Sequence, residues 1–185
     1  VSAIWEKTNM NNISPELFHS IRPEEEIEAG EMLVRPFSIS HDAVDPVCYT
    51  VEKQGKRAAV ATDMGCFDDT IIRVLGQCDS VLIEANHDIR MLQAGPYPYY
   101  LKQRILGNRG HLSNERSGQL IKALLNSHIK AILLGHLSKE NNFEELAYET
   151  VKLELSDNEY ASDVREFGLE VARRDRPGAL LTVGN

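Results

Sequence analysis

The chain has 185 residues, of which 42% are hydrophobic and 26% are charged, and its formal net charge is −8. These values are typical of one soluble globular domain with a sizeable core. They exclude a protein coated in basic surface for indiscriminate nucleic-acid binding, but they allow a local basic groove on an acidic protein.

The cysteine content indicates a reducing compartment. Cys48, Cys66 and Cys78 form an odd, sparse set without CxxC spacing, so we expect ordinary buried thiols rather than a disulfide framework. No apolar run approaches the roughly 20 residues that a membrane span needs. We therefore expect a cytoplasmic protein that does not enter a membrane.

The first half of the chain predicts strands and hairpins. Ser14 and Pro15 suit the start of a short helix, and residues 32–39 read as an extended segment that contains Pro36. Two β-rich runs, 46–52 and 57–61, flank Gly55 and predict an antiparallel hairpin. The glutamates of residues 24–28 suggest an exposed turn.

From Asp68 onward the pattern alternates between helix and strand. Apolar residues at helical spacing predict helices that start after Asp68, near Ser113 or Asn114, and at Glu144. Residues 89–106 predict two helical pieces separated by prolines. Buried strands are expected at 81–83 and 129–134, and short β runs on both sides of a turn at 174–178. The fold class is therefore α/β, or α+β, with helices packed on a sheet.

Chemically versatile side chains follow four of the predicted strands. His41 and Asp42, Thr62 and Asp63, residues 84–88, and His136 each come directly after an extended run. In layered α/β folds, ligands gather at the carboxyl ends of strands. Imidazoles and carboxylates at such ends are donors that zinc, manganese or iron accept.

Each of these residues also has an ordinary structural interpretation. A histidine after a strand finds common hydrogen-bond partners through its two ring nitrogens, and Asp63 before Met64 and Gly65 is a plausible turn former. The joint occurrence at several strand ends favours a metal site, which needs structural context to be tested.

Five runs carry a family resemblance: SHDAVDPVCYTV, ATDMG, LIEANHD, GPYPYYLKQRILGNRGHLSN and LLGHLSKENN. Together they resemble the later part of a metallo-β-lactamase-fold hydrolase of the YycJ-type branch, over about residues 34–151. The combination is far more specific than any single run. The resemblance implies an αββα sandwich, of which residues 1–185 form chiefly the C-terminal half as one partial domain.

The resemblance also implies roles for individual residues. It implies two divalent metals, zinc or manganese, with His41, Asp63 and His136 among their ligands and Asp63 as the bridging carboxylate. Asp63 would thereby take part in catalysis, and His111 matches a histidine near the scissile phosphate, as a phosphate contact or general acid. The branch signature places four further residues behind the ligands, where we expect them to orient the site: Glu84, Asn86, His87 and Asp88.

The substrate implied by the resemblance is a phosphodiester, and a DNA exonuclease is the expected activity. Aromatic and basic residues follow the EANHD run and suit base stacking and phosphate contact: Tyr97, Tyr100, Lys102, Arg104 and Arg109. The ordinary alternative for this run is an amphipathic helix with a basic edge. A hydrolase acting on RNA or on a small phosphodiester is a related alternative.

The sequence departs from the family in one respect. The motif HxHxDH, which supplies most metal ligands in the family, is not found in these 185 residues, and the first residue is Val1. We therefore expect a processed product or a fragment that is inactive alone and has an exposed sheet face. The missing part or a second copy of the chain would cover that face. The alternative from another class is a non-catalytic binding or assembly module that retains the scaffold.

Overall fold

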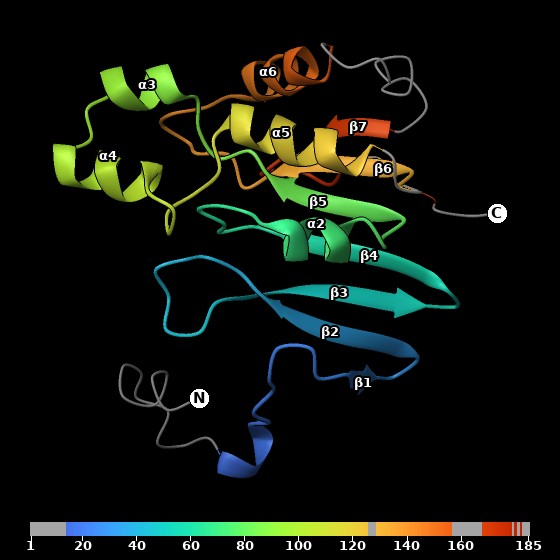
Figure 1. The fold of residues 1–185 in the computed structure, drawn as a ribbon. Helices are drawn as coiled ribbons and strands as arrows, with labels where there is room; N and C mark the ends of the chain where they lie inside the picture. The colour runs from blue at the N-terminus through green and yellow to red at the C-terminus, as the bar shows by residue number, and fades with distance from the viewer. Residues whose placement is uncertain (1–13, 126–128, 157–167, 179, 181, 183–185) are drawn as a thin grey trace.

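The computed structural model describes residues 14–125, 129–156, 168–178, 180 and 182. Within these residues, seven strands form one sheet, and they lie side by side in the order of the sequence (Figure 1). The strands are β1 (Ile27–Ala29), β2 (Met32–Ser38), β3 (Val47–Lys53), β4 (Lys56–Ala61), β5 (Ser80–Glu84), β6 (Ala131–Gly135) and β7 (Gly168–Val171).

The sheet has an antiparallel half and a parallel half. Strands β1 to β4 pair antiparallel, and β4 to β7 pair parallel. Parallel neighbours need crossover connections, which here contain helices. The helices are η1 (Pro15–Leu17, a 3-10 turn), α2 (Asp69–Leu75), α3 (Ile89–Ala94), α4 (Tyr99–Leu106), α5 (Asn114–Leu124) and α6 (Glu144–Ser156).

The helices and strands predicted after Asp68 are confirmed up to β7. The predicted β3–β4 hairpin is also confirmed, and its turn residues Gln54 and Gly55 have φ of 52° and 73°. The short helix predicted to begin at Pro15 is present as a 3-10 turn of three residues. One prediction was wrong, because the predicted exposed turn at 24–28 runs into the edge strand β1. The second β run of the tail lies largely outside the described residues, and its two described residues, Leu180 and Thr182, are not in a strand.

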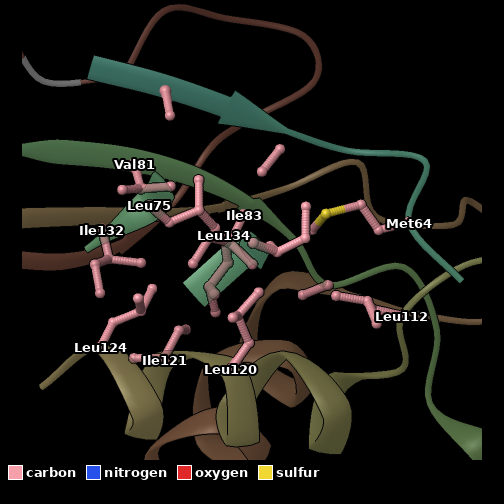
Figure 2. Close-up of a cluster of buried hydrophobic side chains, with 14 of the residues drawn as sticks. Met64, Leu75, Val81, Ile83, Leu112, Leu120, Ile121, Leu124, Ile132 and Leu134 are labelled. Atoms are coloured by element: carbon pink, nitrogen blue, oxygen red, sulfur yellow. The ribbon is translucent and has the colours of Figure 1, made fainter. Parts of the chain in front are cut away.

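The hydrophobic core lies between the sheet and the helices α2, α5 and α6 (Figure 2). Ile83 of β5 and Leu134 of β6 point into it and are fully buried, as are Leu75 of α2 and Leu120 of α5. Cys48 and Cys78 are buried here as free thiols, as predicted, and burial raises the pKa of each to about 11. Cys66 is also a free thiol, but it is only half-buried, contrary to the prediction. This core fixes the strand ends that carry the polar side chains.

The opposite face of the sheet has a different character. Tyr49 of β3 pairs with Val60 of β4, and the same row continues through Leu82 and Leu133. Val60 is 52% exposed and Tyr49 is 37% exposed. Apolar side chains on this face are therefore accessible to solvent, as expected from the sequence.

Among the described residues, each helix is too short or too polar to cross a bilayer.

The core predicts a clear contrast between two leucines. Leu120→Ala should lower the free energy of unfolding by about 2–5 kcal/mol, because it removes a fully buried side chain and leaves a cavity. The matched control is Leu153→Ala on α6, where the leucine is 69% exposed and the change should be within about 0.5 kcal/mol. Urea denaturation of both variants measures the difference, and equal losses would contradict the described core.

Candidate metal centre at the strand ends

The polar residues predicted from the sequence meet at one end of the sheet. Strands β4, β5 and β6 run parallel, so their carboxyl ends share this edge, beyond which the chain continues toward α3 and α4 (Figure 1). A hollow of about 510 Å³ opens there. Its wall includes His41, Asp63, His111 and His136.

The carboxylate of Asp63 lies among three imidazoles. Its Oδ1 atom is 3.7 Å from His41 Nε2, 3.7 Å from His111 Nδ1 and 3.9 Å from His136 Nε2. The ring centroids of His41 and His111 are 5.1 Å apart, and those of His111 and His136 are 5.4 Å apart. Residues that are far apart in the sequence thus form one compact cluster.

This cluster fits a divalent metal. Two overlapping groups, His41–Asp63–His111 and Glu84–His111–His136, each have donor atoms within 4.8 Å of one another. Ligands at about 2.0–2.1 Å from a tetrahedral zinc ion lie roughly 3.4 Å apart, so the spacing around Asp63 is close to that of shared coordination. Nitrogen and carboxylate donors together suit zinc or manganese.

Glu84 forms hydrogen bonds to two of the imidazoles, those of His111 and His136. Its side chain is fully buried at the end of β5, and Oε1 accepts hydrogen bonds from His111 Nδ1 and His136 Nδ1, each 2.7 Å long. The second oxygen, Oε2, accepts the backbone N–H of Met64 at 2.8 Å. Because both Nδ1 atoms donate to Glu84, the Nε2 atoms are left for other partners.

The hydrogen bonds between Glu84 and the imidazoles favour the ionised form of the Glu84 carboxyl and the protonated form of His136. Burial raises the pKa of the Glu84 carboxyl, but the hydrogen bonds from His111 and His136 outweigh it and lower the pKa below its usual value. The hydrogen bond to Glu84 raises the pKa of His136. Glu84 is therefore an anion that compensates positive charge in the hollow.

Backbone strain accompanies two of the clustered residues. Asp63 and His136 have φ of 59° and 55°, in the left-handed region that non-glycine residues adopt infrequently. Such a conformation costs about 1–3 kcal/mol and persists only where the surroundings impose it. This cost is consistent with Asp63 and His136 being held in position by a site rather than lying in unconstrained loops.

A close approach of loops brings His111 to the cluster. A Cβ atom on the preceding Gly110 would lie 2.2 Å from the backbone oxygen of Ile105, so glycine is required there. The carbonyl of Gly110 also lies 3.1 Å from His41 Nδ1. The loop between α4 and α5 thereby contacts both His41 and the Glu84 cluster.

Buried asparagines join the loops around the site. Asn86 Nδ2 donates to the carbonyl of His136 at 2.9 Å. Asn142 Nδ2 donates to the carbonyl of Ala85 at 2.8 Å and to Asn114 Oδ1 at 2.8 Å. Asn86 was predicted from the sequence, whereas the place of Asn114 and Asn142 beside the site was not, because a buried amide network has no local sequence signal.

The remaining signature residues have other surroundings. Asp88 caps α3, with Oδ1 accepting the backbone N–H of Met91 at 2.7 Å. His87 is 1% exposed, and neither ring nitrogen has a hydrogen-bond partner among the described residues. Burial lowers the pKa of His87 to about 4, so the ring is neutral at physiological pH.

The structure brings two of the predicted substrate-binding residues to the hollow. Tyr97 and Arg104 line it, whereas Tyr100 is 74% exposed on α4, a helix that has no buried residue. The predicted cations contact the protein itself: Lys102 Nζ donates to the Gln93 carbonyl, Arg104 forms an ion pair with Asp42, and Arg109 Nε donates to the His41 carbonyl. Arg104 holds the pKa of the Asp42 carboxyl below its usual range.

One lining residue was missed by the sequence analysis. Arg174 lies on the hollow and donates a hydrogen bond from Nη2 to the carbonyl of Leu137. The neighbouring Pro and Gly make the run 173–176 a predicted turn. The run itself does not show that β7 pairs with β6, which is the pairing that brings Arg174 to the hollow. The signal that could have identified Arg174 was the basic composition of the run.

Comparison with known proteins adds a family match and close relatives. Residues 3–137 match the family model for the beta-lactamase superfamily domain. The chain is 43% identical over 127 residues to the exodeoxyribonuclease WalJ of Streptococcus pneumoniae serotype 2, covering 69% of this chain and 47% of that protein. It is 35% identical over 128 residues to the exodeoxyribonuclease YycJ of Bacillus anthracis, covering 69% and 48%. The chain thus spans about half the length of these relatives.

A solved structure shows the same fold. The metallo-β-lactamase fold protein YhfI from Bacillus subtilis superposes with a TM-score of 0.57 at 14% identity, over 83% of this chain and 50% of that one. At this identity the likeness concerns the arrangement of the sheet and helices alone.

The position of Glu84 predicts its effect on metal binding. Glu84→Gln should weaken zinc or manganese binding by about 10–100-fold, because an amide keeps only one of the two accepting oxygens. Either Met64 N–H or the two imidazoles would then face an N–H₂ donor. Calorimetric titration with the metal measures the affinity. Glu149→Gln, at a side chain that is 65% exposed, is the control and should bind as the wild type does.

His87 predicts a specific pH dependence of stability. Its folded-state pKa of about 4 lies below the unfolded value of about 6.5, so only the unfolded chain gains this proton as pH falls from about 6.5 to 4. The free energy of unfolding should therefore fall across that window, by about 1–3 kcal/mol from this group.

Substitution isolates that contribution. His87→Phe should flatten the stability profile between pH 6.5 and 4, as measured by urea denaturation at each pH. His19→Phe, at an exposed histidine, should leave the profile unchanged. Parallel profiles for the wild type and His87→Phe would show that the ring is not held neutral.

Proposed function

Because the chain belongs to the beta-lactamase superfamily and has the metallo-β-lactamase fold, we propose that it serves metal-dependent hydrolysis of phosphodiester bonds in DNA, as an exonuclease. The exodeoxyribonucleases from S. pneumoniae and B. anthracis support the choice of DNA. The match to the family model supports the hydrolytic reaction class.

One observation carries this proposal. The Asp63 carboxylate lies 3.7 Å from His41 Nε2 and 3.9 Å from His136 Nε2, in a hollow that is open to solvent. A set of donors that converges on a hollow can bind a metal ion and leave room for a substrate. The buried anion Glu84 behind two of the imidazoles makes positive charge there favourable.

We assign His41, Asp63 and His136 to metal binding. Two divalent ions, zinc or manganese, would supply a water of lowered pKa and stabilise charge on the attacked phosphate. Asp63 lies between His41 and His136 and is placed to be shared by two ions. Glu84 and Asn86 fix His136 through its ring and its carbonyl, respectively.

We assign His111 to the leaving group of the reaction. Glu84 holds its Nδ1 atom, so Nε2 is the ring nitrogen left to donate a proton to the departing oxygen or to contact the phosphate. His111 therefore has the partners expected of a general acid.

Two substitutions separate these roles. Asp63→Asn should abolish metal binding and metal-dependent cleavage of end-labelled DNA. His111→Ala should retain the metal while the rate falls by about 10²–10⁴-fold, the usual contribution of general acid–base catalysis. His19→Ala is the control and should behave as the wild type does. Metal content and cleavage are measured on the same samples.

The same experiment decides between classes of function. About two equivalents of zinc or manganese together with cleavage support the enzyme. A soluble, folded protein that takes up no metal would contradict the proposal and favour a non-catalytic binding module. Metal uptake without cleavage would agree with the expectation that these residues alone are inactive, because HxHxDH is not found among them. Loss of metal in His111→Ala would instead make His111 a ligand, in agreement with its place in both donor groups.

A further inference from the structure

A second hollow adjoins the metal centre. It has a volume of about 720 Å³ and lies between the loop after β6 and the segment that follows β7. His136, Leu137, Ser138 and Arg174 line both hollows, so the two are continuous along this edge. We call the second one the arginine hollow, after the arginines 173, 174 and 176 in its wall.

The wall of the arginine hollow is positive on an otherwise acidic chain. Lys139 joins the arginines, and the opposing carboxylates are Glu144 and Glu145. Four cations thus face two anions, whereas the whole chain carries a formal charge of −8. Arg173 Nε lies 4.0 Å from Glu144 Oε2, so one of the two carboxylates is compensated locally. A focused positive patch of this kind attracts a polyanion.

Arg174 connects this patch to the metal centre. One of its guanidinium nitrogens donates to the Leu137 carbonyl, which anchors the side chain between the two hollows. A guanidinium has five N–H donors, so others are left for phosphate oxygens. A phosphate held there would lie next to His136.

An aromatic side chain completes the wall. Phe143 lines the arginine hollow just before α6, and its side chain is 50% exposed. Its position is set by Asn142, whose Oδ1 accepts the backbone N–H of Phe143 at 3.0 Å. An accessible ring beside cations is the combination that holds unpaired bases and their phosphates.

We propose that the arginine hollow binds a single-stranded polynucleotide, with the arginines on consecutive phosphates and Phe143 stacked on a base. The inference rests on the proposed function, because it treats the strand as the continuation of a substrate held at the metal centre. It adds a binding surface on the β6–β7 side, opposite to the Tyr97–Arg109 run that the sequence suggested.

The test is the salt dependence of strand binding. Fluorescence anisotropy with a labelled dT dodecamer is measured from 50 to 300 mM salt, in EDTA so that no strand is cut. Each lost phosphate contact lowers the slope of log affinity against log salt by about 0.7 for single strands. Arg173→Ala/Arg176→Ala removes two phosphate contacts and should therefore lower the slope by about 1.4. Both arginines lie outside the metal hollow, so the change reports on the arginine hollow alone.

Matched variants exclude trivial causes. Arg173→Lys/Arg176→Lys keeps the charges and should keep most of the slope. Arg73→Ala, at an exposed arginine on α2 that lines neither hollow, should leave the slope unchanged. Phe143→Ala should weaken dodecamer binding by about 5- to 150-fold without changing the slope, and Phe143→Trp should preserve it. A dT dinucleotide, which fills only the metal hollow, should bind all these variants equally.

The outcomes distinguish this inference from the proposed function. An unchanged slope in Arg173→Ala/Arg176→Ala, or a wild type that does not bind the dodecamer at 50 mM salt, overturns the arginine hollow whether or not DNA is cleaved. A reduced slope in a protein without metal-dependent cleavage supports the arginine hollow and overturns the nuclease assignment alone. An equal loss in Arg73→Ala would show a general charge effect and would also overturn the inference.

Discussion

The buried carboxylate of Glu84 is the constraint on which the rest of the site depends. Removing such a group from water costs several kcal/mol, which is offset here by two imidazole N–H donors and the backbone N–H of Met64. These bonds join the end of β5 to the end of β6, to the loop after β4 and to the loop before α5. A single anion thus sets the tautomers of two histidines and the spacing of three strand ends.

The fold supplies what this anion requires. The parallel pairs of β4, β5 and β6 place three carboxyl ends at one edge, and the helices behind them exclude water from the Glu84 side. Asp63 and His136 have left-handed backbone conformations, and Asn86 Nδ2 holds the His136 carbonyl at 2.9 Å. Local strain is tolerated because the core, not the loops, provides the stability.

The sequence predicted the candidate site residues that directly follow strands. It missed the residues whose place beside the site depends on contacts between distant parts of the chain. Polar residues after apolar runs located Asp63, Glu84 and His136, because parallel strands end together. Asp88 caps α3, a role that its place before an apolar run also predicts, and its predicted position behind the metal ligands stays a prediction. The pairing of Arg104 with Asp42, across 62 positions, has no local signal, and neither has the approach of Arg174 to the hollow.

The order of the sheet has a consequence for how the site forms. Strands β1 to β7 lie side by side as they occur in the sequence, so each strand pairs with the strand that precedes it in the chain. Bringing such neighbours together closes shorter loops, and costs less chain entropy, than pairing distant strands would. The cluster nevertheless needs residues from both sides of α5, because Glu84 is bound by His111 before that helix and by His136 after β6. The site is therefore complete only when the longest of these connections, from β5 to β6, has closed.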